Sequence, residues 1–98
     1  MLTTEFVLIE LADGMASPLS RKSCAAFIDW LRLDEDVTIV PATSELFDEG
    51  LALYRSRDDK KWSLTDCTSF VVMKREGLVE ALSRNHNFDQ AGFKPLLI

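Results

Sequence analysis

A run of β-branched residues closed by a proline, Val37 to Pro41, is the feature that most constrains the fold. Valine, threonine and isoleucine favour extended backbone because their branched side chains pack well on a pleated surface. The run therefore predicts a short strand that is buried on both faces. Strands of this kind belong to parallel sheets, whose strands are joined by helical crossovers. We therefore expect an α/β chain.

Patterns typical of helices flank this strand on both sides. Apolar residues spaced by three and four, each run opened by a Ser or Thr, predict helices over residues 4–15, 20–33, 43–57 and 63–76. In the last of these, Ser63 and Asp66 are spaced as a capping pair, and Gly77 ends the helix. An acidic turn at 34–36 and a charged loop at 58–62 connect these elements.

The C-terminal part is expected to complete a small sheet. Residues 78–82 and 93–97 are predicted strands, the second lying at a sheet edge because it contains Pro95. Between them we expect a polar turn at 85–87 and at most one helical turn at 88–91. The order helix, helix, strand, helix, helix, strand, strand indicates an α/β domain with a small sheet.

Length and charge limit the class of protein. The 98 residues fit one small domain, and 47% of them are hydrophobic. Sixteen acidic and eleven basic side chains give a net charge of −5, which argues against binding nucleic acid by bulk electrostatics. An acidic chain can still bind RNA locally, through metal ions.

The cysteines and the histidine limit which cellular compartment and which kinds of catalytic or metal site we expect. Cys24 and Cys67 are far apart and follow no leader sequence, so we interpret both as reduced core thiols of a cytoplasmic protein. The neighbouring Asp66 would raise the pKa of Cys67, which argues against a nucleophile. The apolar stretch Phe6–Ile9 is far too short to span a membrane. A single histidine, His86, and no CxxC pair argue against a zinc site.

Two carboxylates stand in otherwise apolar surroundings. Glu10 lies between Ile9 and Leu11, and Asp66 lies in the first turn of a core-like helix. Asp66 alone is interpreted either as a helix cap, which is the commoner role, or as a metal ligand. Glu10 alone is interpreted either as a solvated helix edge, again the commoner role, or as a ligand.

Three segments carry a family resemblance. They are Thr3-Thr4-Glu5-Phe6-Val7-Leu8-Ile9-Glu10-Leu11, Asp59-Lys60-Lys61-Trp62-Ser63-Leu64-Thr65-Asp66-Cys67-Thr68-Ser69-Phe70, and Ala81-Leu82-Ser83 followed by Phe88-Asp89-Gln90-Ala91-Gly92-Phe93. Together they resemble PIN domains of the VapC-like toxin type, in the order of that family and over essentially the whole chain. The Trp-Ser-Leu-Thr-Asp-Cys string is the most specific of the matching segments.

The resemblance implies a fold and a site. The fold would be a three-layer α/β/α sandwich around a parallel sheet, and carboxylates at the strand ends would hold Mg²⁺ or Mn²⁺ for hydrolysis of single-stranded RNA. Glu10 and Asp66 match catalytic, metal-binding positions of the family, and Asp59 falls on a further acidic position. Ser63 and Thr65 would orient these carboxylates through hydrogen bonds.

The sequence also departs from the family. The family's first strand ends in an essential aspartate well before the position of Thr3, so we expect residues 1–98 to form a single PIN-like domain truncated at its N-terminus. A later carboxylate is replaced by Asn85, which can offer a carbonyl oxygen but no charge, and Ser83 stands for a threonine. Asp89 is interpreted as a surface charge.

The basic and aromatic residues before Asp66 each have two possible interpretations, a role in RNA binding and a purely structural role. Arg55, Arg57, Lys60 and Lys61 could contact RNA phosphates or form solvated surface. Trp62 could stack on a base, although packing against the neighbouring helix is the commoner role.

The resemblance leads to two functional hypotheses. The first is a metal-dependent ribonuclease of a toxin–antitoxin pair, with RNA as substrate and an antitoxin protein as partner. The second is an inactive PIN remnant that acts only in protein–protein interaction through the helices at 4–15 and 20–33. A missing strand would expose a parallel sheet edge, so we expect a homodimer or strand exchange in either case.

Overall fold

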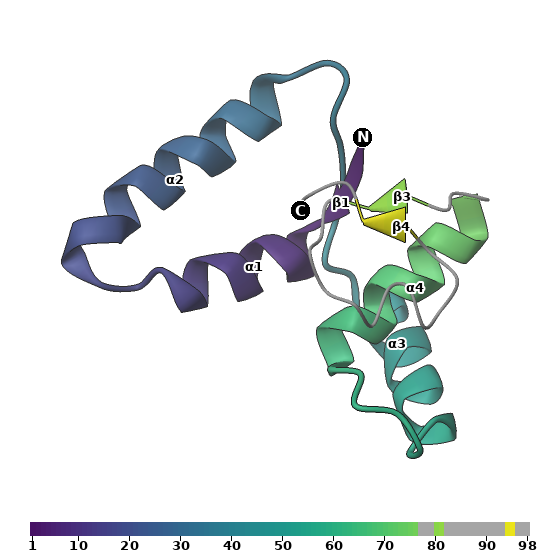
Figure 1. Ribbon diagram of the computed structural model, residues 1–98. Coiled ribbons are helices and arrows are strands. Elements are labelled where there is room, and N and C mark those ends of the chain that lie inside the picture. The colour runs from purple at the N-terminus through teal and green to yellow at the C-terminus, as the bar shows by residue number, and fades with distance from the viewer. Residues whose placement is uncertain (77–79, 82–93, 96–98) are drawn as a thin grey trace.

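The computed structural model describes residues 1–76, 80–81 and 94–95 (Figure 1). The elements, in chain order, are β1 Leu2–Thr4, α1 Glu5–Gly14, α2 Pro18–Leu33, β2 Thr38–Val40, α3 Ser44–Ser56, α4 Leu64–Glu76, β3 Glu80–Ala81 and β4 Lys94–Pro95. The predicted turn at 85–87 and the helical turn at 88–91, with Asn85, lie outside the described residues. The fold is α/β and mostly helical, as the sequence indicated.

The strands pair in parallel, as the β-branched run predicted. β1 pairs with β2 in the register Leu2 to Thr38, and β3 pairs with β4 in the register Glu80 to Lys94. Within the described residues these are separate two-stranded sheets. A small parallel sheet is therefore present, whereas the three-layer arrangement stays a prediction.

Two details of the first sheet correct the sequence-based predictions. β1 was not predicted, because Thr3 and Thr4 were assigned to a helix cap. Thr4 in fact ends the strand and also caps α1, since its Oγ1 accepts a hydrogen bond from the backbone N of Val7 at 3.1 Å. β2 is not buried on both faces either, because Thr38 is exposed and Ile39 is only half-buried. In the described part of the chain, β2 has β1 as its one neighbouring strand, so no strand covers its other edge.

The residues at their N-termini account for the positions at which α2 and α3 begin. α2 begins two residues earlier than predicted, after Ser17 and with Pro18 in its first turn, where a missing N–H costs nothing. α3 begins after Thr43, whose Oγ1 accepts from the N of Leu46 at 3.1 Å. The predicted ranges of all four helices are otherwise confirmed to within a few residues.

The core lies between α3 and α4. Its buried side chains are Trp62, Cys67, Phe70 and Met73, with Leu53 of α3 packed against them. The two helices approach closely where Gly50 of α3 meets Thr68 of α4. α1 contacts both α4 and α2. A hydrogen bond at 2.7 Å from the N of Ala42 to the Glu5 carboxylate ties the start of α1 to the segment after β2.

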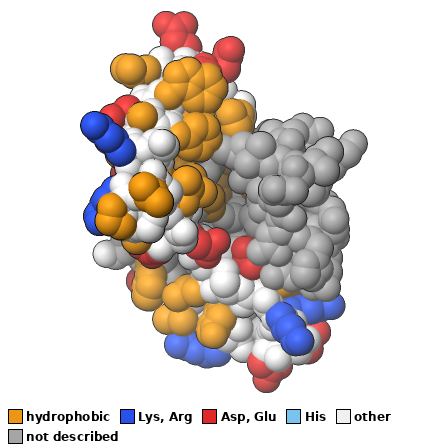
Figure 2. All heavy atoms as spheres, turned by 60° about the vertical axis from the view of Figure 1, so that its left-hand side comes forward, with side chains coloured by type: hydrophobic (Ala, Val, Ile, Leu, Met, Phe, Trp, Pro, Cys, Tyr) orange, Lys and Arg blue, Asp and Glu red, His pale blue; other side chains and the backbone are white. Residues whose placement is uncertain are grey.

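The helices α1 and α2 form a hairpin that extends to one side of α3 and α4 (Figure 1). Figure 2, in which this side is turned toward the viewer, shows hydrophobic side chains gathered on the hairpin. Its exposed large apolar residues are Ile9, Leu19, Phe27, Trp30 and Leu33. Among the described helices, none has the length and apolar character needed to cross a bilayer.

Candidate functional site

Asp66 is fixed at the N-terminus of α4 by reciprocal hydrogen bonds. The backbone N of Ser63 donates to the Oδ2 of Asp66 at 3.1 Å, and the N of Asp66 donates to the Oγ of Ser63 at 3.0 Å. Asp66 is only 4% exposed. The capping pair predicted from the sequence is therefore confirmed, and it holds a buried carboxylate in one orientation at the positive end of a helix.

Glu10 and Thr65 are placed differently from Asp66. Glu10 lies on α1, which contacts α4, and its side chain is exposed. Thr65 is half-buried, and its carbonyl oxygen accepts a hydrogen bond from the hydroxyl of Thr68 at 2.6 Å. The proposed role of Thr65 in orienting a carboxylate stays a prediction.

Asp59 pairs with a cation of its own loop. The Nε and Nη2 atoms of Arg57 donate to its two carboxylate oxygens at 3.0 and 3.2 Å. This hydrogen-bonded ion pair lowers the pKa of Asp59 and raises the pKa of Arg57. Over the described ranges, no group of three or more His, Cys, Asp or Glu side chains is gathered closely enough to hold a metal. The carboxylates suit Mg²⁺ or Mn²⁺ in chemical kind.

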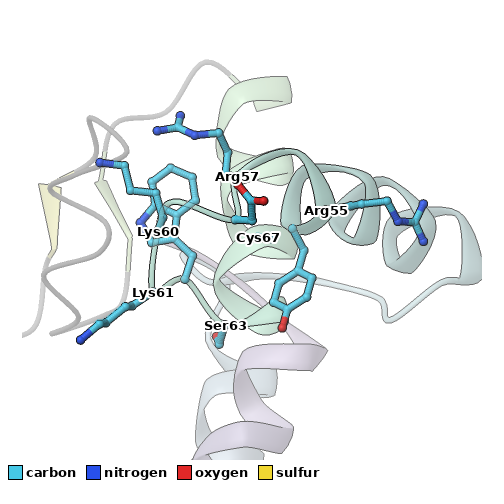
Figure 3. A pocket seen from close by; sticks show the side chains of 9 residues that line it. Arg55, Arg57, Lys60, Lys61, Ser63 and Cys67 are labelled. Atoms are coloured by element: carbon cyan, nitrogen blue, oxygen red, sulfur yellow. The ribbon is translucent and has the colours of Figure 1, made fainter.

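The predicted basic residues surround one cavity of about 520 Å³ beside the start of α4 (Figure 3). Its walls include Arg55, Arg57, Lys60 and Lys61. In Figure 3, Arg55 points away from the other cations, which extend on the opposite side. Ser63, the capping partner of Asp66, also lines this cavity, which we call the basic pocket. The basic pocket and the buried carboxylate are therefore neighbours.

The indole ring of Trp62 packs against the guanidinium group of Arg57. The guanidinium carbon of Arg57 lies 5.1 Å from the centroid of the indole ring, a cation–π arrangement. The indole meets the ring of Phe70 edge-on, with 5.0 Å between centroids, and is 8% exposed. The packing interpretation of Trp62 is thus confirmed. Sequence reasoning missed that Trp62 and Asp59 together hold Arg57, although the spacing Arg57-x-Asp59 was a signal for that ion pair.

Cys67 is fully buried, and desolvation, with a smaller contribution from Asp66, raises the pKa of its thiol. Cys24 is buried as well, and neither cysteine forms a disulfide. The interpretation of both as reduced core thiols is confirmed. A thiol with a raised pKa is mostly protonated near neutral pH and is a poor nucleophile.

The ion pair gives a direct prediction for the Asp59 titration. Arg57→Gln is expected to raise the pKa of Asp59 toward its ordinary value, because the hydrogen bonds from Arg57 are the largest cause of its lowered pKa. Because the pKa of Asp59 is lower in the folded state than in the unfolded state, the ion pair stabilises the fold at pH values above the unfolded-state pKa. This stabilisation is lost as the pH falls through the folded-state pKa. Carboxyl-carbon NMR titration of both proteins measures the shift. Identical titration midpoints would contradict the pairing.

A family model of the PIN domain matches residues 1–94, and the chain belongs to the PIN domain family. Within that family it is similar to VapC toxins, and in particular to VapC20. The curated 23S rRNA-specific endonuclease VapC20 of two Mycobacterium tuberculosis strains is 30% identical over 63 residues, which are 64% of this chain and 48% of the relative. The chain spans about half the length of these curated relatives.

A solved structure supports the same relationship. The crystal structure of Mycobacterium tuberculosis VapC20, described as a sarcin-ricin loop cleaving toxin, superposes with a TM-score of 0.81 at 26% sequence identity. The superposition covers 95% of this chain and 71% of that chain. The resemblance predicted from the three sequence segments is therefore confirmed, and the fold is PIN-like.

Proposed function

We propose that this chain carries the site of a metal-dependent endonuclease that hydrolyses phosphodiester bonds of single-stranded RNA. The observation that carries the proposal is the buried Asp66, held by Ser63 at the start of α4 in a chain of the PIN family. The hydrogen bond from Ser63 offsets the cost of burying this carboxylate and keeps it in place at the start of the helix. The similarity to the rRNA endonuclease VapC20 supports RNA as the substrate class.

The residues have separate roles in this proposal. Asp66 and Glu10 would hold Mg²⁺ or Mn²⁺, with Asp59 as a further candidate ligand, and Asn85 would contribute an amide oxygen. Ser63 orients the Asp66 carboxylate through its backbone N–H, and Thr65 is a candidate for a similar role. A carboxylate-bound divalent cation supplies polarisation of a phosphoryl oxygen and a lowered pKa for a bound water. We further propose that the residues form one PIN-like domain in a cytoplasmic protein.

A cleavage assay tests this function. Single-stranded RNA labelled at its 5′ end is expected to be cut with Mn²⁺ and to stay intact with EDTA, and Glu10→Gln is expected to lower the rate about 100-fold or more. Glu35→Gln is the matched control, because this exposed side chain precedes β2, at the end of the sheet opposite to α1. Cleavage that persists in EDTA, or that survives Glu10→Gln, would contradict the proposal.

A second candidate function is protein–protein interaction by an inactive PIN domain. The exposed apolar side chains of the α1–α2 hairpin favour it, notably Leu19 at 95% and Trp30 at 59% exposure. Such a surface fits a second copy of the chain, as in a homodimer, or an antitoxin protein. Light scattering is expected to show a dimer, and a strict monomer that ignores candidate antitoxins would count against this function.

A further inference from the structure

We infer that the basic pocket is an anchoring site for a backbone phosphate of single-stranded RNA, in which Arg57 binds the phosphate and Asp59 positions Arg57. The inference rests on the proposed function for its choice of RNA, and it concerns binding rather than cleavage. It also gives Asp59 a role other than metal ligation.

The charge around the basic pocket is opposite in sign to that of the chain as a whole. The full sequence carries a net charge of −5, whereas the pocket is lined by four cationic side chains and one carboxylate, Asp58. Arg57, Lys60 and Lys61 extend on the same side of it (Figure 3). Such a local reversal of charge attracts an anion to this place. RNA phosphates are anions of this class.

Arg57 is held in place before any ligand arrives. Its guanidinium lies over the buried Trp62 ring, and its Nε and Nη2 atoms bond the two oxygens of Asp59. These contacts fix both the plane and the rotation of the guanidinium group. The Nη1 edge is the part that we assign to the phosphate. A side chain fixed in this way loses little conformational entropy when it binds.

The position of the basic pocket favours RNA over an acidic peptide. Ser63 lines the pocket and at the same time donates its N–H to the Asp66 carboxylate. A strand whose phosphate is held by Arg57 would therefore continue toward the carboxylate proposed to take part in cleavage. The planar guanidinium group of arginine can form paired hydrogen bonds to phosphate oxygens. Lysine adds electrostatic attraction that depends little on orientation.

RNA binding in EDTA tests the phosphate site apart from any cleavage. The probe is a short fluorescein-labelled oligouridylate, and its Kd and the salt dependence of that Kd are measured by anisotropy. Arg57→Gln is expected to raise Kd about tenfold and to reduce the slope of log K against log salt by about 0.7, as one lost phosphate contact does. Arg21→Gln, an equal charge change on the exposed face of α2, is expected to alter neither quantity.

Asp59→Asn tests the positioning role by the sign of its effect. Removing a negative charge near RNA strengthens binding if only the net charge matters. If Asp59 positions Arg57, Asp59→Asn is expected to weaken binding about threefold. Because Asp59 is exposed, loss of its ion pair with Arg57 should lower the melting temperature only slightly. Partial unfolding therefore cannot account for the weaker binding.

Each outcome decides a separate part of the inference. Equal Kd values for Arg57→Gln and Arg21→Gln would overturn the phosphate site, and tighter binding by Asp59→Asn would overturn the positioning role. Stronger binding of a labelled oligoglutamate than of the RNA would overturn the choice of RNA. Because EDTA is present throughout, these results do not depend on metal-dependent cleavage, and the failure of either proposal can be recognised separately.

Discussion

Asp66→Asn is expected to weaken Mn²⁺ binding by at least about 100-fold. Mutating a residue that hydrogen-bonds a metal ligand lowers metal affinity by roughly 10- to 100-fold, and loss of the proposed ligand itself should cost at least as much. The same change is expected to lower the free energy of unfolding by less than about 1 kcal/mol, since asparagine still offers an oxygen to a backbone donor. The Ser63 N–H that bonds Asp66 at 3.1 Å therefore keeps an acceptor. Isothermal calorimetry and urea denaturation measure the two quantities.

Two further variants separate the proposed metal-ligand role of Asp66 from its observed capping role. Asp66→Ala removes both, so it is expected to abolish Mn²⁺ binding and to destabilise the fold by about 1–2 kcal/mol. Asp29→Asn, on the exposed face of α2, is the matched control and should change neither quantity. Equal Mn²⁺ affinities for Asp66→Asn and Asp29→Asn would show that Asp66 is a cap alone.

The parts of the fold that local sequence dictates could be predicted. Thr43 and the pair Ser63 and Asp66 begin their helices through hydrogen bonds to backbone groups three residues away. Contacts between residues so close along the chain depend on residue type and spacing, which can be read from the sequence. The helices were therefore predicted to within a few residues, and the buried carboxylate was recognised with its cap.

The parts that depend on distant pairing could not be predicted in the same way. β1 is a strand only because Thr3 pairs with Ile39, thirty-six positions along the chain. The half-buried state of Ile39 depends on how many strands surround it, which its own sequence does not encode. Likewise, the ion pair between Asp59 and Arg57 depends on the shape of their loop, in which the Trp62 ring lies against the arginine.

Gly50→Ala is expected to lower the free energy of unfolding by about 2 kcal/mol, within the range for overpacked cores. An added Cβ would lie 2.5 Å from the Cγ2 of Thr68 and 3.2 Å from its Cα and N. The methyl contact can relax, but the backbone contacts require α3 and α4 to separate. That separation would open the core around Trp62 and Phe70.

Matched variants show that this effect comes from the helix contact and not from the loss of a glycine. Gly14→Ala adds the same methyl where nothing lies within 4 Å, so it is expected to raise stability by at most about 1 kcal/mol. Thr68→Ser removes the nearest methyl group and keeps the hydroxyl that bonds the Thr65 carbonyl. Combined with Gly50→Ala, it should recover about half of the loss, since neighbouring sites are not additive. Strict additivity in urea denaturation would mean that α3 and α4 do not meet at this pair.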